Sequence, residues 1–139
     1  MSNGKVGWHE SRLADALYLA AELDEAGALY EQLLEKDPSW RVAYYGSLGA
    51  VAARKGDRAT AEAYITALAG VDIPEEAEPY DVALARARIA ALLGDAGRAL
   101  AYLRAGYNGG QGVDLHADVD FEDVLAHNRA FQEFVRPKG

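Results

Sequence analysis

The strongest constraint on the fold is a repeated pattern, which is clearest in residues 37–68. This stretch has apolar residues at helical spacing on both sides of a Gly56-Asp57 pair. Asp37 and Pro38 stand where the first helix would start, since the missing N–H of proline is not needed there. Gly56 can adopt the left-handed backbone that ends a helix, and Asp57 can cap the next one. The stretch therefore predicts two short helices folded against each other.

Two further copies of this pattern flank the central one, at spacings of roughly 35 and 38 residues. The downstream copy has Gly94-Asp95 at its turn, whereas the upstream copy has Ala21-Glu22, and we expect this upstream turn to be looser. Such a period is typical of a helical solenoid, in which each hairpin packs on its neighbours. Small residues recur at equivalent places of the copies: Ala14, Gly49 and Ala87 in the first helices, and Ala26, Ala61 and Ala99 in the second.

The pattern resembles the tetratricopeptide repeat over residues 8–107. The resemblance implies an all-α fold, a right-handed α-solenoid of about three helix hairpins with one or two C-terminal capping helices. The hairpins would span residues 8–38, 39–74 and 79–107. Residues 1–7 would be a disordered N-terminus or a cloning remnant, and residues 108–139 a glycine-rich loop and the capping segment. Outside the central hairpin, the expected helices span residues 8–21, 24–36, 80–93 and 96–107.

The C-terminal segment carries its own helix signals. Residues 120–123 resemble a capping box that opens a short helix, and Asn128 can cap a last helix. The tail is also similar to the segment that closes tetratricopeptide arrays in multidomain bacterial proteins, including arrays attached to Ser/Thr kinases or cyclase-like regulators. The matching residues are Asp120, Phe121, Leu125, Asn128, Arg129 and Phe131. This resemblance implies that the chain is the C-terminal part of a larger regulatory protein.

Composition argues against several classes of function. The chain has 22 acidic and 14 basic residues, a formal net charge of −8, whereas a nucleic-acid-binding protein needs a basic surface for phosphates. It has no cysteine, which rules out disulfides and thiolate metal sites. No apolar run reaches membrane-spanning length and no signal peptide opens the chain. We therefore expect a cytoplasmic protein that does not insert into membranes.

The sequence has no recognisable catalytic motif. Its histidines, His9, His116 and His127, lack the i, i+4 spacing of a helical zinc site. The glycine-rich stretch at residues 106–112 follows a helix and offers no lysine, unlike a phosphate-binding loop. No nucleophile motif is present either. We expect no enzyme activity and no cofactor.

An alternating acidic segment, residues 114–120, raises the alternative of a metal or small-ligand site. Its oxygens and imidazole, from Asp114, His116, Asp118 and Asp120, could gather around a cation. The segment lacks the glycine turn and closing glutamate of a calcium loop. Helix capping and solvation explain these acids more simply.

In the tetratricopeptide family the first helix of each repeat lines a concave groove that accepts a peptide or another protein. Carried over to this chain, the resemblance implies a groove lined by Arg12, Asp15, Tyr18, Ala43, Ser47, Ala50, Arg54, Leu84 and Arg88, which we call the predicted groove. The clamp that the family uses for the C-terminal carboxylate of heat-shock chaperones is not expected here. Asp15 and Asp81 stand at its positions and would repel a carboxylate.

Two arginines determine what the predicted groove would bind. Its floor in the middle repeat is small and apolar, with Arg54 and Arg88 as strong donors. This suits a segment that places an apolar side chain on the floor and a carboxylate near an arginine. In the alternative, the arginines pair with Asp15, Asp81 or Glu22 of their own surface and bind nothing.

The pattern thus predicts a non-catalytic scaffold that binds a protein or peptide in the predicted groove. The alternative is a self-associating, homo-oligomeric module, in which an exposed repeat face or the tail with Phe131 and Phe134 docks on a second copy. Trp40, close after Pro38, is expected to pack between repeats.

Overall fold

The computed structural model describes residues 3–71, 79–106, 119–121 and 126–135. This part of the chain contains helices and no strand, so the predicted all-α class is confirmed there. The helices are α1 (Asn3–Leu19), α2 (Leu23–Lys36), α3 (Arg41–Arg54), α4 (Arg58–Ala69), α5 (Pro79–Leu92), α6 (Ala96–Gly106) and α8 (Arg129–Val135), with 3-10 turns η1 (Pro38–Trp40) and η2 (Val119–Phe121).

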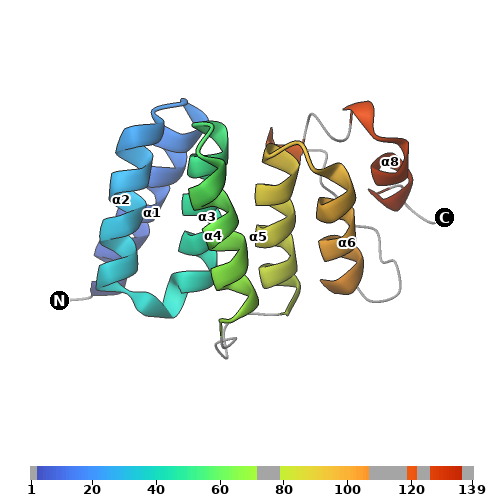
Figure 1. The fold of residues 1–139 in the computed structure, drawn as a ribbon. Coiled ribbons are helices and arrows are strands. Elements are labelled where there is room, and N and C mark those ends of the chain that lie inside the picture. Colours follow the sequence, from blue (N-terminus) through green and yellow to red (C-terminus); the bar gives the residue numbers. More distant parts are fainter. Residues whose placement is uncertain (1–2, 72–78, 107–118, 122–125, 136–139) are drawn as a thin grey trace.

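The helices pack in chain order. Consecutive helices form the contacting pairs α1–α2, α3–α4 and α5–α6, and these pairs lie side by side in Figure 1. Between pairs, α2 packs on α3, while α5 packs on both α3 and α4. At the C-terminal end α8 packs on α6, and η2 contacts α5. Among the described residues after α6, both η2 and α8 therefore pack on the helical pairs.

Two local expectations are corrected. The first helix begins at Asn3, so residues 3–7, expected to be disordered, are helical. A glycine inside a helix costs about 1 kcal/mol, far less than a proline, and the two glycines here do not stop the helix. Trp40 is 58% exposed rather than packed between repeats, because it ends the η1 turn at the surface. The residues between the second and third expected hairpins (75–78) and most of the acidic segment (114–118) lie outside the described residues.

The three hairpin turns share one geometry. Each contains a residue with positive φ: Ala21 at 64°, Gly56 at 82° and Gly94 at 83°. In each, two backbone N–H groups donate to carbonyl oxygens three and five residues earlier, as in a Schellman motif. These bonds, 2.8–3.1 Å long, run from Ala21 to Tyr18, Glu22 to Leu17, Gly56 to Ala53, Asp57 to Ala52, Gly94 to Ala91 and Asp95 to Ala90. The expectation of a looser first turn is wrong, since the same bonds hold alanine in the left-handed conformation.

The turns differ in their helix caps. Asp57 Oδ1 accepts from the backbone N–H of Thr60 at 3.2 Å, which confirms the predicted cap of α4. The Asp95 carboxylate likewise accepts from the N–H of Arg98 at 3.1 Å. Glu22, at the equivalent place before α2, makes no side-chain cap. The first hairpin therefore has the same turn without this stabilising bond.

Ala21→Gly is expected to raise the free energy of unfolding by roughly 0.5 kcal/mol, because relief of the left-handed strain, about 1–2 kcal/mol, exceeds the added entropy of the unfolded chain. Gly56→Ala is expected to lower it by about 1 kcal/mol. A Cβ at Gly56 meets no atom within 4 Å, so this cost is conformational. Urea denaturation measures both values, and a stabilising Gly56→Ala would contradict the shared geometry.

Small residues allow close packing between the pairs. All six small-residue positions predicted from the repeat are buried: Ala14, Ala26, Gly49, Ala61, Ala87 and Ala99. A Cβ at Gly46 would lie 2.9 Å from the Cβ of Ala85, and one at Gly49 would overlap Ile89. Because α3 approaches α5 this closely, side chains of α1 and α5 can meet a common partner across the C-terminal half of α3.

Candidate functional site

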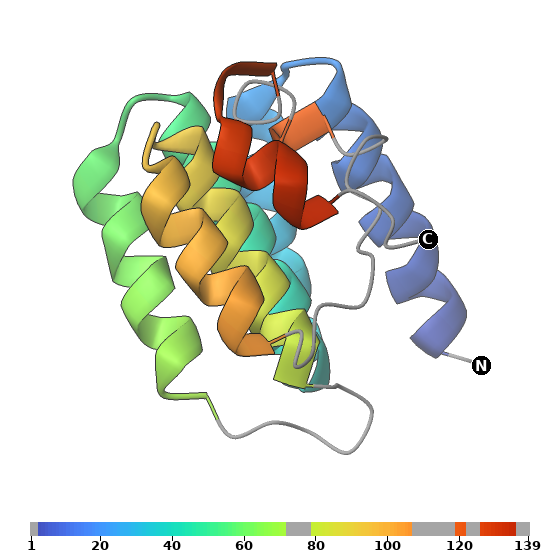
Figure 2. The same cartoon turned by 90° about the vertical axis from the view of Figure 1, so that its right-hand side faces the viewer.

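The η2 turn brings a carboxylate between α1 and α5. The Tyr18 hydroxyl donates to Asp120 Oδ1 at 2.5 Å, and Arg88 Nε lies 3.1 Å from Asp120 Oδ2. Asp120 is only 8% exposed. A buried carboxylate is tolerated when a cation and a hydrogen-bond donor offset its lost hydration, and this one has both. In Figure 2 the orange η2 turn lies near the C-terminal end of blue α1. We call Tyr18, Arg54, Arg88, Asp120 and Phe121 the Asp120 site.

Arg54 fixes the tyrosine of this site. Its guanidinium donates from Nη1 to the Tyr18 carbonyl oxygen at 2.8 Å, and its Cζ lies 4.5 Å from the centroid of the Tyr18 ring. A cation over an aromatic ring is attracted to its electron-rich face. The same cation lies at the C-terminal end of α1, where the helix dipole favours positive charge. Arg54 thus holds the ring whose hydroxyl meets Asp120.

Phe121 supplies the apolar half of the site. Its side chain is fully buried, with an exposed fraction of 0%. It packs into one cluster with residues of α5 and α6: Ala87, Ala90, Ala91, Ala99, Leu100 and Leu103, with Leu84 partly buried against them. The alanines leave room on α5 and α6 for one aromatic ring. Neighbouring residues of η2 therefore place a carboxylate and a phenyl ring in adjacent environments.

A second tyrosine–carboxylate pair lies close to the first. The Tyr30 hydroxyl donates to Asp15 Oδ1 at 2.5 Å, and Tyr30 is 2% exposed. Its pKa is raised mainly by burial and then by Asp15, while a hydrogen bond with Ser47 opposes the rise. The charge of Asp120 also raises the pKa of Tyr30, so the two pairs share one electrostatic environment.

Burial likewise raises the pKa of the Tyr18 hydroxyl, with the bond and charge of Asp120 adding to the shift and Arg54 opposing it. Both phenols are therefore held neutral. Their contribution to stability is complete below pH 10, the ordinary value, and is lost as pH rises toward the higher folded values.

Above pH 10 the free energy of unfolding is expected to fall by up to about 1.4 kcal/mol per pH unit for each of Tyr18 and Tyr30. The unfolded chain releases these protons first, so alkali favours unfolding. Urea denaturation between pH 8 and pH 11.5 measures the slope. In Tyr18→Phe/Tyr30→Phe the slope is expected to flatten, although stability at pH 8 drops because Asp15 and Asp120 lose donors. An unchanged slope would contradict the assignment.

The predicted groove is only partly brought together. Tyr18, Arg54 and Arg88 converge on one site, and Leu84 packs against the cluster that contains Phe121. Ser47 and Asp15 both interact with Tyr30. Of the remaining predicted residues, Ala50 is buried in the core, whereas Ala43 and Arg12 are exposed.

Sequence reasoning missed the two residues that meet these side chains. The sequence predicts a helix cap or a cation ligand at Asp120 and a closing tail at Phe121. The expected ligand of the predicted groove was nevertheless a carboxylate beside an apolar side chain, and Asp120-Phe121 has that chemistry. The signal was present, but its place in the fold depends on contacts over 102 residues of sequence.

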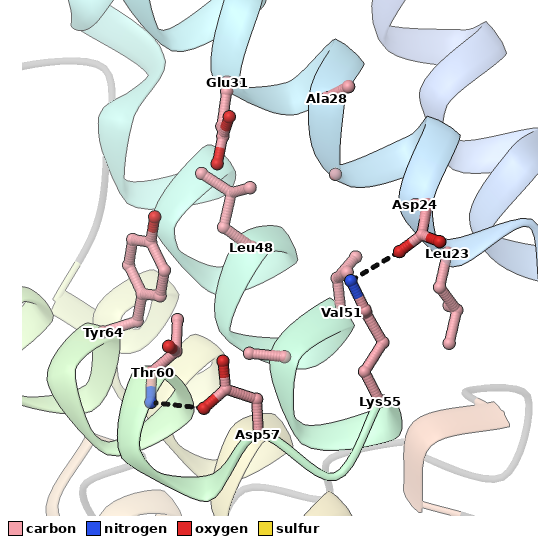
Figure 3. A pocket seen from close by; sticks show the side chains of 12 residues that line it. Leu23, Asp24, Ala28, Glu31, Leu48, Val51, Lys55, Asp57, Thr60 and Tyr64 are labelled. Atoms are coloured by element: carbon pink, nitrogen blue, oxygen red, sulfur yellow. Dashed lines mark hydrogen bonds and ion pairs between the residues drawn. The ribbon is translucent and has the colours of Figure 1, made fainter.

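A separate pocket of about 390 Å³ lies between α2 and α4 over α3 (Figure 3). Lys55 points toward Asp24 and pairs with it, with Nζ and Oδ1 2.5 Å apart. The Asp57 carboxylate in this pocket is the cap of α4. Over the described ranges, no three metal-ligating side chains gather in this pocket or elsewhere. The polar groups at both ends of the pocket thus serve the helices that form it.

Comparisons with family models, curated proteins and solved structures found no match to this chain. No helix in the described part of the chain is long and apolar enough to cross a membrane. The contacts of the Asp120 site are therefore the observations that bear on function.

Proposed function

We propose that this chain is a non-catalytic, cytoplasmic protein-interaction scaffold, whose predicted groove binds a segment of a partner protein. One observation carries the proposal: residues of the predicted groove on α1 and α5 bind the carboxylate of a remote segment of the same chain, and the phenyl ring of that segment is buried against α5 and α6. A surface that holds one such segment has the chemistry to hold another.

The composition of the Asp120 site supports this function. Protein interfaces take most of their binding energy from a few buried aromatic and arginine side chains. Tyr18, Phe121 and the largely buried Arg88 are of this kind, and the buried carboxylate of Asp120 gives the contact a fixed register. The aromatic, arginine and carboxylate side chains of the Asp120 site support recognition of a segment rather than catalysis by a nucleophile paired with a base.

The helical pairs support the finer fold assignment, three tetratricopeptide-like hairpins in a right-handed α-solenoid. Their turns repeat one hydrogen-bond pattern, and the small residues at equivalent positions are buried. In such an array the first helices α1, α3 and α5 form the inner surface, and the predicted groove lies on them. The resemblance of the tail supports a place at the C-terminal end of a larger regulatory protein.

Capture of partners from a lysate tests the proposed function. We expect a partner that binds the wild type and is lost from Ala43→Arg/Arg54→Glu, which alters exposed groove positions and leaves Arg88 in place. The matched control is Ala101→Arg/Arg104→Glu, the same pair of changes at exposed positions of α6. A partner that the groove variant retains at the wild-type level would place binding elsewhere.

Self-association is a second candidate, favoured by exposed apolar side chains. Leu13, Leu19 and Trp40 are 55%, 67% and 58% exposed, and each is available to a second copy. This candidate predicts a molar mass in light scattering that rises with concentration and returns to that of the monomer in Trp40→Ser. A constant monomer mass would eliminate it.

A further inference from the structure

We propose that Tyr18 and Arg88 of the predicted groove, together with the adjoining surface of α5 and α6, recognise an acidic–aromatic segment, an aspartate followed by phenylalanine, and that η2 is an internal copy of this ligand which a partner protein displaces. The inference rests on the proposed function and names the chemistry of the partner. It follows from two sets of contacts in the Asp120 site: polar side chains bind the Asp120 carboxylate, and apolar side chains surround the Phe121 ring.

The polar side chains of the Asp120 site, Tyr18 and Arg88, select a buried carboxylate. Tyr18 and Arg88 come from α1 and α5, and they meet different oxygens of one carboxylate at 2.5 and 3.1 Å. An occupant without that carboxylate would leave a buried hydroxyl and a largely buried guanidinium without this partner, which is costly. A site built around polar groups rejects occupants that lack the matching group more strongly than a purely apolar site does.

The apolar half selects the adjacent side chain. Phe121 lies among alanines of α5 and leucines of α6 and has no exposed surface. A smaller side chain would leave a cavity among these residues, and a charged one would be desolvated without a partner. Because the two halves adjoin, the ligand must present its carboxylate and its ring from consecutive residues.

The occupant belongs to a separate part of the chain. Tyr18 and Asp120 are 102 residues apart in sequence, and η2 comprises three residues. Its side chains reach both the first and the third helical pair, as a bound peptide would. A partner with the same dipeptide offers the same groups, so it competes with η2 for one site.

Competition by an internal ligand sets the expected affinities. A tethered segment acts at an effective concentration on the order of 1 mM. If the free site bound the dipeptide segment with a Kd of about 1 µM, the internal copy would weaken an external peptide roughly 1000-fold. Weakening the internal copy should therefore tighten external binding.

The probe is a fluorescein-labelled peptide with the sequence of residues 117–128, titrated against the full chain by fluorescence anisotropy. We expect it to bind Asp120→Asn/Phe121→Leu, which keeps the shape of η2, at least tenfold more tightly than the wild type. Peptides with Asn in place of the central Asp, or Ala in place of the Phe, should bind at least tenfold more weakly than the parent peptide. Adding Arg88→Met to the weakened chain should abolish the gain.

If Asp120→Asn/Phe121→Leu does not fold, binding of the peptide to the wild type still tests the proposal. The wild-type groove should take up the peptide at concentrations on the order of the effective concentration of the tethered segment, about 1 mM. Absence of binding up to several times that concentration would overturn the proposal. So would equal binding of the parent and altered peptides.

Selection of random twelve-residue peptides on the wild type separates this inference from the proposed function. Peptides that lose binding to Ala43→Arg/Arg54→Glu and contain the acidic–aromatic pair are the expected result. Groove-dependent peptides without that pair would overturn the inference and leave the scaffold function standing. Recovery of no groove-dependent peptide would overturn both.

Discussion

Phe121→Ala is expected to lower the free energy of unfolding by about 3–5 kcal/mol, a large share of the stability of a chain of this size. The side chain is fully buried among residues of α5 and α6, and its removal leaves a cavity that helices α5 and α6 can close only in part. Urea denaturation followed by circular dichroism gives the value. The loss would show that η2 is part of the packed structure rather than an appendage.

The matched control is Trp40→Ala, another aromatic-to-alanine change, at a side chain that is 58% exposed. Exposed substitutions usually stay within about 0.5 kcal/mol, so this variant should be near neutral. If Phe121→Ala cost no more than Trp40→Ala, η2 would not be seated on α5 and α6 in solution.

Arg88→Met is expected to cost about 3 kcal/mol, because it leaves the Asp120 carboxylate buried without its cation. The Asp120 side chain is 7% exposed, and that of Arg88 27%. A second change, Asp120→Leu, should restore part of the lost stability in the double variant, since an apolar pair needs no hydration. Thermal or urea denaturation of the wild type, both single variants and the double variant gives the four free energies of unfolding that this double-mutant cycle compares.

An exposed ion pair of the same chain gives the control. Arg129 and Glu133 lie 3.4 Å apart on α8, with side chains 90% and 60% exposed. Arg129→Met should change the free energy of unfolding by less than about 0.5 kcal/mol, since water already solvates both groups. Equal costs for Arg88→Met and Arg129→Met would mean that the Asp120 pair is also solvated.

The helical pairs were predictable because their signals are local. Apolar spacing, the Gly-Asp turns and the buried small residues all lie within one repeat, and the structure places them as expected. The first turn departs from that rule for a physical reason. Backbone hydrogen bonds to Tyr18 and Leu17 hold Ala21 at positive φ, although its side chain disfavours that conformation.

Only one part of the Asp120 site, the side chains on α1, α3 and α5, could be predicted from the sequence. The resemblance to the tetratricopeptide repeat predicts Tyr18, Arg54 and Arg88 in one groove, and their side chains indicate the chemistry of a ligand. The position of Asp120 and Phe121 does not, because a three-residue turn has no periodicity and its partners lie far away in sequence. Tertiary contact, rather than local preference, decides where η2 lies.

If η2 is an internal ligand, it contacts Tyr18 and Arg88 in the free protein and leaves them when an acidic–aromatic segment binds. Because the chain has no cysteine, Ala43→Cys and Ala126→Cys can be spin-labelled specifically, and both positions are exposed. Electron–electron double resonance would then measure the distance between α3 and the residues that follow η2. We predict one narrow distribution for the free protein and a longer, broader one with the 117–128 peptide at saturation. A distribution that stays unchanged while the peptide binds would contradict the claim.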